Sequence, residues 1–338
     1  FGHPERELTL IGVTGTNGKT TITTVIKKVL SQFGCKVGLI GTCQNEIGDD
    51  VYPTARTTPE PYDLFELFRK MADEKCDYVV MEVSSQGLEQ RRVAGCRYKV
   101  GVFTNLTQDH LDVHGTMENY YQAKKLLFGI SDNAIINIDD AYGRRYAAEV
   151  SCPVKTYSVN GKADFRGDDV LLSASGVKYV FSDGKSKHNV SFAMPGLFNV
   201  SNSLAVIACC EILGFSVDKT IKAFEDIHGV RGRAEIVPTG RDFTVICDYA
   251  HTPDALVNVL TAIKDSAKGK VKCLFGCGGN RDRTKRAPMA AAAADHADFL
   301  IVTSDNPRNE DPNEIIKDVL EGLKGKDTPY ITIPDRRE

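Results

Sequence analysis

Residues 11–21 read IGVTGTNGKTT, an apolar run that ends in a glycine-rich turn before a lysine and two threonines. This order predicts a β-strand, a phosphate-binding loop and the first turn of a helix. Gly15 and Gly18 allow the backbone to curl so that its N–H groups point at phosphate oxygens. Lys19 can reach the β- and γ-phosphates of a nucleotide, and the Thr20 hydroxyl can ligate magnesium.

Short strand-like runs alternate with longer helical stretches beyond this loop, for example KVGLIGT, DYVVMEVSS and NAIINID. Such alternation predicts an α/β fold with a mostly parallel sheet. Between Tyr157 and Ala193, period-two alternation around a Ser-Asp-Gly turn predicts a β-hairpin. The strand pattern restarts near Gly232. We therefore expect a central P-loop domain over 1–232 and a Rossmann-like α/β domain over 233–338.

The composition is that of an ordinary globular protein, with 338 residues, 42% hydrophobic, 26% charged and a net charge of −3. This charge balance gives no electrostatic reason to expect nucleic acid or an acidic membrane surface as a partner. No apolar run approaches the ~18 residues that a membrane helix needs. The ten cysteines lie mostly in apolar stretches, which favours reduced thiols and a cytoplasmic protein.

The segment TGTNGKTT is more specific than a general phosphate loop, and it resembles the Mur ligase family and the related folylpolyglutamate synthetases. Further motifs match in the same order along nearly the whole chain, and the ordered set is much more specific than any one motif. They are TTP (57–59), MEVSS (81–85), FTNLTQDHLDVHG (103–115), YQAKKLLF (121–128), NIDD (137–140), PGLFNVSN (195–202), GVRGRAE (229–235), DYAHTPDAL (248–256), GCGGNRDRTKR (276–286) and DNPRNEDP (305–312).

The resemblance implies an ATP-dependent ligase that makes an amide bond. The γ-phosphoryl group of ATP is transferred to a substrate carboxylate, and an amine attacks the resulting acyl phosphate. Such chemistry needs magnesium ligands, cations and backbone donors more than a strong nucleophile. The motifs are most similar to the branch of the family that adds the third residue of the peptidoglycan stem peptide. The implied substrates are small molecules, including a UDP-N-acetylmuramoyl dipeptide, and we expect a monomer.

The family has three domains, and this chain matches the second and most of the third. We therefore expect a UDP-binding domain before Phe1 and further residues after Glu338. The stretch by itself is expected to bind ATP but not to complete the ligation.

The metal and catalytic residues follow from the resemblance, together with the magnesium role of Thr20. Glu82 ends an apolar strand, where ligands gather in open α/β sheets, and it matches a magnesium ligand. His110 matches the metal-binding histidine of the family, although a lone histidine is more often structural. Lys124 matches a lysine that carbon dioxide converts to a carbamate, an anion that helps to hold a second magnesium. Its sequence context alone would predict a solvated helix face. Lys19, His110 and Lys124 form the catalytic set.

The remaining nucleotide and substrate contacts also rest on the resemblance. The nucleotide set comprises Gly15, Thr16, Asn17, Gly18, Lys19, Thr20 and Thr21 in the loop, Asn199 and Asn202 for adenine, Arg233 for the phosphates and Asp248 for the ribose. The nucleotide-sugar peptide is expected on Thr57, Thr58, Ser84, Gln90 and Arg92. Among these, Arg92 suits a carboxylate or phosphate partner.

The segment Asp305-Asn306-Pro307-Arg308 bears on which amino acid is added. It resembles the form that accepts meso-diaminopimelate, whereas lysine-adding relatives lack the arginine. Diaminopimelate is lysine with a second carboxylate at its far end. A guanidinium binds such a carboxylate bidentately and repels an ammonium group. Arg281 matches a second arginine of the amino-acid site.

The sequence departs from the family pattern at three positions that we assign no catalytic role. Gln86, Arg231 and Asn280 stand where the family often has histidine, proline and aspartate. In addition, the first glycine of the general phosphate-loop pattern would fall at Val13, and Gly12 and Gly15 take its place.

Four other interpretations are open from the sequence. They are a lysine-adding or other Mur ligase, a folylpolyglutamate synthetase, a nucleotide-binding relative without catalysis, and a P-loop switch protein. The joint presence of Lys19, Glu82, His110 and Lys124 argues against a relative that only binds nucleotide. A switch protein would lack the second α/β domain.

Overall fold

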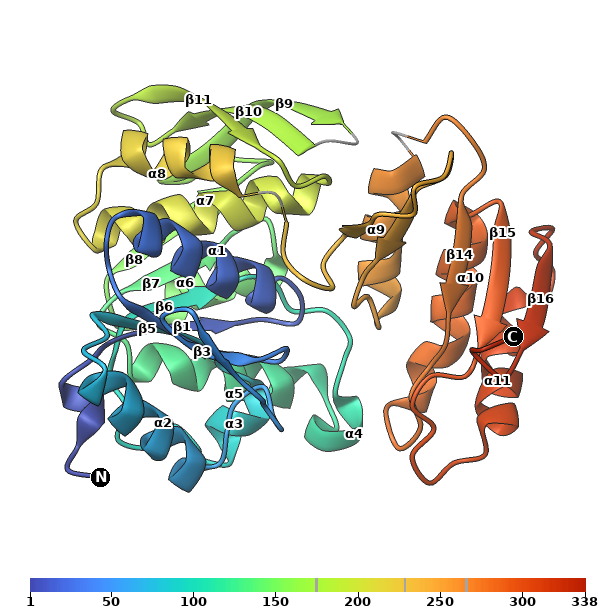
Figure 1. The fold of residues 1–338 in the computed structure, drawn as a ribbon, viewed down its shortest axis with the longest axis horizontal. Coiled ribbons are helices and arrows are strands. Elements are labelled where there is room, and N and C mark those ends of the chain that lie inside the picture. The colour runs from blue at the N-terminus through green and yellow to red at the C-terminus, as the bar shows by residue number, and fades with distance from the viewer. Residues whose placement is uncertain (174–175, 228, 265–266) are drawn as a thin grey trace.

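The computed structural model describes residues 1–173, 176–227, 229–264 and 267–338. These residues form two α/β bodies that follow one another along the chain, the first coloured blue to yellow and the second orange to red (Figure 1). We call residues 1–227 the first body and residues 233–338 the second body. The predicted α/β class with a mostly parallel sheet is confirmed.

The first body is built on one sheet, with the strand order β11-β10-β9-β8-β7-β6-β1-β5-β2-β3-β4 in the described residues. Its parallel strands are β1 (Thr9–Thr14), β2 (Val37–Ile40), β5 (Tyr78–Glu82), β6 (Tyr98–Phe103), β7 (Ala134–Asn137) and β8 (Val154–Ser158). Val13 lies opposite Glu82, and Thr14 lies opposite Phe103. Because these neighbours are parallel, the segments that follow β1, β5 and β6 meet at the carboxyl ends of the strands.

Antiparallel strands extend the sheet on both sides. They are β3 (Asn45–Ile47) and β4 (Asp50–Tyr52) at one edge, and β10 (Gly176–Ser182) and β11 (Lys187–Phe192) at the other, where β9 (Phe165–Ser173) pairs in parallel with β8 and antiparallel with β10. β10 and β11 pair from Val177 with Phe192 to Ser182 with Lys187. The hairpin predicted around the Ser-Asp-Gly turn is therefore confirmed.

Helices cover both faces of the sheet because successive residues of a buried strand point to opposite sides. Ile11 and Val13 pack with α1 (Lys19–Gln32) and α7 (Leu197–Ile212), whereas Leu10 packs with α2 (Pro61–Asp73). The other helices of this body are α3 (Ser85–Glu89), α4 (Leu111–His114), α5 (Met117–Gly129), α6 (Ala141–Glu149), α8 (Val217–Ala223) and the 3-10 helices η1 (Pro4–Arg6) and η2 (Phe224–Asp226).

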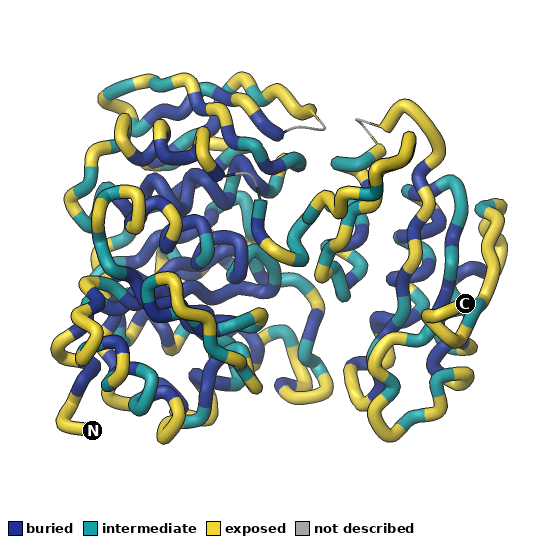
Figure 2. The backbone as a smooth tube through the Cα atoms, viewed as in Figure 1, coloured by how far each residue is buried: buried dark blue, intermediate teal, exposed yellow. Residues whose placement is uncertain are grey.

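Burial is concentrated in the central strands and in α7 (Figure 2). Every residue of α7 from Asn202 to Cys210 is buried. A helix that is apolar on all sides belongs inside a protein. Accordingly, α7 packs against both α1 and the strands β8 and β9.

The second body contains a parallel sheet with the order β14 (Lys272–Phe275), β15 (Phe299–Thr303) and β16 (Tyr330–Ile333). A separate antiparallel pair is formed by β12 (Glu235–Val237) and β13 (Val245–Cys247). Its helices are α9 (Pro253–Lys264), α10 (Arg286–His296), α11 (Pro312–Leu320), η3 (Arg283–Lys285) and η4 (Glu321–Leu323). The alanine run of α10 lets α9 and α11 approach closely, because alanine adds little side-chain bulk.

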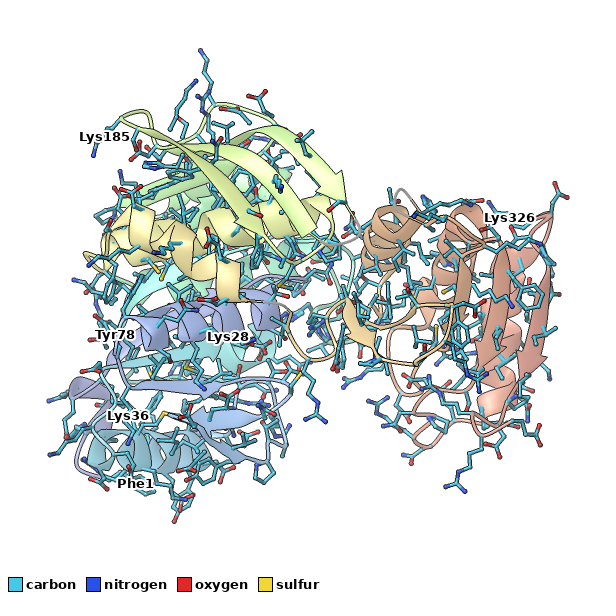
Figure 3. The ribbon with its side chains drawn as sticks, turned by 45° about the horizontal axis from the view of Figure 1, so that its top comes forward. Phe1, Lys28, Lys36, Tyr78, Lys185 and Lys326 are labelled. Atoms are coloured by element: carbon cyan, nitrogen blue, oxygen red, sulfur yellow. The ribbon has the colours of Figure 1, made fainter. Side chains whose placement is uncertain are left out.

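The chain passes from the first body to the second between η2 and β12. Lys28, which Figure 3 labels on α1, donates a hydrogen bond to the Gly229 carbonyl in this connection at 2.9 Å. The boundary expected between 232 and 233 lies in the same connection and remains a prediction. Within the described residues, no helix combines the length and apolar character needed to cross a membrane.

Candidate active site

The phosphate loop connects the end of β1 to the start of α1. Gly15 and Gly18 have φ values of 148° and 88°, in the region that favours glycine. A Cβ atom on Gly15 would lie 1.8 Å from Thr104 Oγ1, so no side chain fits there. Asn17 N–H donates to Asn105 Oδ1 at 2.9 Å, and Thr104 Oγ1 donates to the Asn17 carbonyl at 2.6 Å. Thr104 and Asn105, which follow β6, therefore hold the loop in place through hydrogen bonds to Asn17.

Two lysine amines lie against this loop. Lys19 Nζ donates to the carbonyls of Gly15 and Thr16, both at 2.9 Å, and Lys124 Nζ donates to the same Gly15 carbonyl at 2.9 Å. Burial lowers the pKa of the Lys19 amine. Burial and the nearby Lys19 charge hold the pKa of the Lys124 amine well below its ordinary value. Burial thus disfavours the charged forms of both amines, and a bound anion would favour them.

Glu82 is the last residue of β5, so it lies at the same carboxyl ends of the strands, and it is 1% exposed. Its Oε1 accepts from Thr20 Oγ1 at 3.0 Å, while Thr42 donates through its N–H at 2.9 Å and through its hydroxyl at 3.0 Å. Thr42 was missed by the sequence analysis, because nothing in its local sequence links it to a residue forty positions away. The Thr20 hydroxyl at the start of α1 and the Glu82 carboxylate at the end of β5 are oxygen groups of the kind that magnesium prefers.

His110 immediately precedes α4 and has a left-handed conformation, with φ of 54°. Burial lowers the pKa of its imidazole to about 4, so the ring is neutral near pH 7 and can offer a lone pair to a metal. In the described parts of the chain, no three side chains among His, Cys, Asp and Glu gather as a metal cage. This is compatible with magnesium, which usually keeps several waters and takes few protein ligands.

The second body reaches the phosphate loop directly. Arg233 Nη2 donates to Thr20 Oγ1 at 2.7 Å, and the guanidinium stacks over Tyr249 at 4.6 Å. Asn17 Nδ2 is 3.4 Å from Asp254 Oδ2 at the start of α9. Asp248 is fixed by the N–H groups of Ala234 and Ala250, both at 2.7 Å, and burial raises the pKa of its carboxyl.

Asn199 and Asn202 lie on the first turns of α7 and are buried. Asn202 Nδ2 donates to Asn199 Oδ1 at 3.0 Å, and Asn199 Nδ2 donates to the Pro195 carbonyl at 2.7 Å. A Cβ atom on Gly18 would lie 2.9 Å from Asn202 Oδ1, which places this amide against the phosphate loop. The structure thus brings Asn202 to the loop, with Asn199 one turn behind it.

The residues expected to hold the nucleotide-sugar peptide gather at the end of β5. Thr58 Oγ1 donates to the Glu82 carbonyl at 3.0 Å, and Ser84 N–H donates to Thr58 Oγ1 at 2.9 Å. Arg92 Nη1 donates to the Thr58 carbonyl at 3.0 Å, and its Nη2 bonds Gln90. Thr57 and Thr42 share a hydroxyl contact of 3.0 Å. Residues up to 35 positions apart therefore form one cluster beside Glu82.

The residues expected to hold the amino acid lie on two loops of the second body, after β14 and after β15. Arg308 Nη1 donates to the Gly279 carbonyl at 2.8 Å, and Gly279 N–H donates to the Asn306 carbonyl at 2.9 Å. Arg308 and Arg281 are exposed and face the same glycine, because a Cβ atom on Gly278 would meet both side chains. Asp305 instead pairs with Arg336 at 3.4 Å. Pro307 supplies a carbonyl to Glu310 N–H at 3.0 Å.

Arg286 anchors both loops. The sequence analysis assigned it no role and included it only as the last residue of the motif GCGGNRDRTKR (276–286). Its side chain is 1% exposed and pairs with Glu310 at 2.9 Å and Asp318 at 2.8 Å. Its Nη2 also donates to the Gly278 carbonyl at 3.3 Å. One buried guanidinium therefore connects the loop after β14, the loop after β15 and α11.

We expect Arg286→Met to lower the free energy of unfolding by about 3 kcal/mol, because it removes a fully buried partner of two carboxylates. Arg283→Met is the matched control, since Arg283 contacts the same Asp318 at 2.9 Å but is 65% exposed. It should cost less than about 1 kcal/mol. Urea unfolding of the chain, followed by far-UV circular dichroism, measures both. Equal losses for the two variants would contradict the anchoring role.

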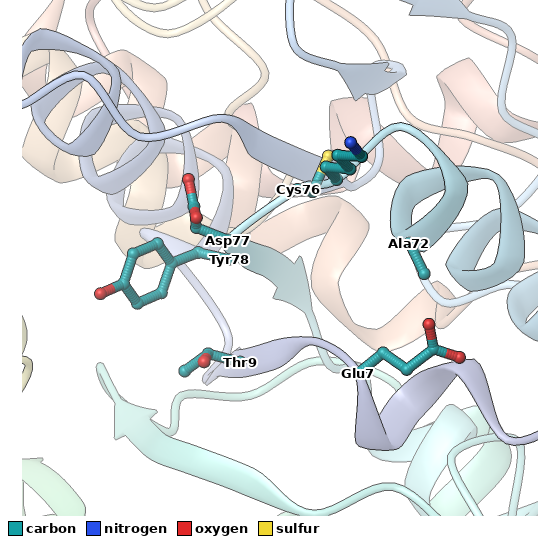
Figure 4. A pocket seen from close by; sticks show the side chains of 7 residues that line it. Glu7, Thr9, Ala72, Cys76, Asp77 and Tyr78 are labelled. Carbon is teal, nitrogen blue, oxygen red and sulfur yellow. The ribbon is translucent and has the colours of Figure 1, made fainter.

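One hollow lies away from these residues (Figure 4). It measures about 470 Å³ and is lined by Glu7, Thr9, Ala72, Lys75, Cys76, Asp77 and Tyr78. Thr9 and Tyr78 begin β1 and β5, so this hollow is at the opposite ends of the strands from the phosphate loop. Ligands of open α/β sheets bind at the carboxyl ends. A smaller hollow of about 50 Å³ is at that end and includes Thr20, Glu82 and Arg231.

Two protein families match the sequence. Residues 13–210 match the Mur ligase middle domain, and residues 232–338 match the Mur ligase, glutamate ligase domain. The chain is 46% identical over 347 residues to a UDP-N-acetylmuramoyl-L-alanyl-D-glutamate--2,6-diaminopimelate ligase of Geobacillus thermodenitrificans, covering 100% of the chain and 71% of the relative. It is 47% identical over 339 residues to a ligase of the same name from Caldanaerobacter subterraneus, covering 100% and 70%.

Similar solved structures agree with these relatives. A UDP-N-acetylmuramoyl-L-alanyl-D-glutamate--2,6-diaminopimelate ligase superposes with a TM-score of 0.71 at 35% identity, over 98% of this chain and 69% of that one. Folylpolyglutamate synthase of Mycobacterium tuberculosis superposes with a TM-score of 0.80 at 17% identity, over 99% and 84%. The second likeness is one of fold alone.

Proposed function

Because the chain belongs to the Mur ligase family, we propose that it forms the ATP-binding and amino-acid-binding parts of a ligase that adds meso-diaminopimelate to UDP-N-acetylmuramoyl-L-alanyl-D-glutamate in peptidoglycan synthesis. The observation that carries the proposal is the meeting of both bodies at one hydroxyl. Thr20 Oγ1 contacts Glu82 at 3.0 Å and Arg233 at 2.7 Å. A phosphoryl group placed there would meet an oxygen ligand for magnesium and a cation from each body.

The first step is transfer of the γ-phosphoryl group of ATP to the glutamate carboxylate of the nucleotide-sugar peptide, which gives an acyl phosphate and ADP. Lys19 and the N–H groups of the loop hold the phosphates, and Arg233 neutralises charge from the other side. The cluster of Thr58, Ser84 and Arg92 next to Glu82 would hold the peptide so that its carboxylate faces the γ-phosphate. Positioning of this kind converts a bimolecular step into one between held groups.

Magnesium fits the residues at the carboxyl ends of the strands. Thr20, Glu82 and His110 would hold it, and it would supply charge neutralisation for the phosphates. Lys124 would contribute if its amine is converted to a carbamate. That modification requires a neutral amine, and burial holds the pKa of Lys124 well below its ordinary value. The hydrogen bond of Lys124 to the Gly15 carbonyl places the amine beside the loop that binds the phosphates.

The second step is attack of the amino group of diaminopimelate on the acyl phosphate, which forms the amide and releases phosphate. Arg308 would bind the distal carboxylate, and Arg281 and Asn306 would hold other polar groups of the amino acid. The exposed guanidinium of Arg308 has one nitrogen fixed on Gly279, so its orientation is set before the substrate binds.

The reaction consumes ATP and a nucleotide sugar, which places the proposed enzyme in the cytoplasm. We also propose a monomer, because the two bodies of one chain complete the nucleotide site. A folylpolyglutamate synthetase is less well supported, since that relative shares the fold at 17% identity whereas the diaminopimelate ligases share 46% and 47%.

Phosphate release tests the function. The full-length protein is given ATP, UDP-N-acetylmuramoyl-L-alanyl-D-glutamate and one of meso-diaminopimelate, L-lysine or L-glutamate. Release with diaminopimelate alone is the expected result. Release with lysine would keep the ligase but reject the role of Arg308, and release with none of the three would reject the proposed reaction.

Carbon dioxide should be required if Lys124 is carbamylated. In buffer freed of carbon dioxide, we expect kcat to fall by about tenfold or more, with recovery on addition of bicarbonate, because the carboxylate on Lys124 is lost. Lys125→Arg is the control, since Lys125 is on the same helix but pairs with Glu149 at 2.7 Å. It should behave as the wild type, whereas Lys124→Arg should be weakly active and insensitive to bicarbonate. A wild type indifferent to carbon dioxide would contradict the carbamate.

A further inference from the structure

Asp109 lies where the segment after β6 meets the second body, and it is 3% exposed. Its Oδ1 is 3.1 Å from Lys285 Nζ. Its Oδ2 is 3.3 Å from His251 Nε2 and 3.4 Å from His110 Nε2. One buried carboxylate therefore contacts two side chains of the second body and one of the first.

Each of these three contacts adjoins a segment with a proposed role. His110 is itself a proposed magnesium ligand. Lys285 ends η3, four residues after Arg281 of the amino-acid loop. His251 follows Asp248, the proposed ribose ligand, by three residues. The carboxylate of Asp109 is thus in contact with the metal, amino-acid and nucleotide segments at once.

The Asp109–Lys285 pair differs from a surface ion pair. Lys285 is 7% exposed, so both charges have lost most of their water and depend on each other for compensation. The neighbouring contact between the same two segments, from Gln108 Nε2 to Thr284 Oγ1 at 2.9 Å, is exposed and uncharged. Water can replace that contact when the bodies separate, and it can replace the Asp109–Lys285 pair only by entering a buried site.

We propose that Asp109 is a positioning residue that couples docking of the second body, through Lys285, to the orientation of the neighbouring His110. This inference rests on the proposed function. When Lys285 docks, the Asp109 carboxylate is held between Lys285 and the two histidines, and His110 is fixed next to the phosphate loop. The amino-acid loop that leads into Lys285 is brought to the nucleotide site by the same contact.

The coupling has a kinetic signature. Without the Lys285 charge, the docked arrangement would leave Asp109 buried and uncompensated, so that arrangement would be less populated. The phosphate loop in the first body would be unchanged. The variant should therefore lose much more in kcat than in affinity for ATP, because only the contacts from Arg233 and Asp248 are weakened, and a loss of folding would not produce this difference.

The test compares Lys285→Met, Asp109→Asn and the double variant in the full-length protein, by phosphate release with diaminopimelate. We expect each single variant to lower kcat by about 30-fold or more, because each leaves one buried charge without its partner. The double variant should be no worse than the poorer single variant, because both charges are then gone. Lys285→Arg keeps the charge and should retain at least a third of the wild-type kcat.

Two further measurements make the result specific. Calorimetric titration with a non-hydrolysable ATP analogue should give Kd values within about tenfold of the wild type for all variants, a smaller change than the loss of kcat. Small-angle X-ray scattering with the analogue should show a larger radius of gyration for Lys285→Met than for wild type and Lys285→Arg. Gln108→Ala is the control and should match the wild type in every measurement.

The inference is overturned if Lys285→Met behaves like Gln108→Ala, or if the losses of the two single variants multiply in the double variant. If Lys285→Met does not fold, Lys285→Arg and the double variant test the inference, with the expected activities given above. If the wild type releases no phosphate with diaminopimelate, the proposed function fails instead. Scattering with the nucleotide analogue then still decides whether Lys285 holds the two bodies together.

Discussion

Replacing Lys19 with methionine is expected to lower kcat/KM for ATP by about a thousandfold or more, the largest loss of any single change in the chain. Methionine keeps the length and apolar stem of lysine but removes its charge. In the structure the amine spans the loop, bonding the carbonyls of Gly15 and Thr16, and it lies within the same small region as Lys124 and Arg233. It is the cation that the loop itself supplies to the transferred phosphoryl group.

The Lys19→Met substitution should lower kcat as well as the affinity for ATP. The charge on the γ-phosphoryl oxygens is redistributed in the transition state, and a fixed cation there stabilises it without reorganisation. Phosphate release and calorimetric binding of an ATP analogue separate the two effects. Lys28→Met is the matched control, because Lys28 is on the same helix and its amine bonds the Gly229 carbonyl instead of the loop. A Lys19→Met enzyme within tenfold of the wild type would remove the phosphate loop from the mechanism.

The parts of this site that the sequence could predict are those with short-range causes. Gly15 and Gly18 are glycine because the loop needs backbone conformations that other residues avoid, and their spacing to Lys19 sets the geometry. The order of strands and helices could be predicted because hydrophobic periodicity is local. The hairpin of β10 and β11 follows from an alternating pattern and its turn, which lie within sixteen residues of each other.

The parts that could not be predicted depend on contacts between distant residues. Asp109 and Lys285 are 176 positions apart, and neither has a local feature that marks it as a partner of the other. Thr42 donates to Glu82 only because β2 lies beside β5 in the sheet. Arg286 lies in a motif with three other basic residues, yet it is buried by two loops and α11. The family motifs include Asp109, Lys285 and Arg286 but not Thr42, and only the fold shows what each of these residues contacts.

Replacing Arg308 with methionine is expected to lower kcat/KM for diaminopimelate by about a hundredfold or more, with little change in the affinity for ATP. The side chain is exposed and fixed at one nitrogen by the Gly279 carbonyl, so its other N–H groups are available to a ligand. A guanidinium can bind the distal carboxylate through two parallel hydrogen bonds, which an ammonium cannot. Arg308→Lys should therefore be intermediate between the wild type and Arg308→Met.

The ratio of kcat/KM for diaminopimelate to that for L-lysine is the decisive quantity, because general damage to the enzyme cancels in it. L-lysine has the same chain without the distal carboxylate, so it gains nothing from Arg308 and brings an ammonium group near its charge. Arg308→Met removes both effects, and the ratio should fall by at least as much as the diaminopimelate value itself. Arg283→Met, an exposed arginine paired with Asp318, should leave the ratio unchanged. If the ratio survives in Arg308→Met, the distal carboxylate is bound elsewhere, and Arg281 on the facing loop becomes the residue to replace.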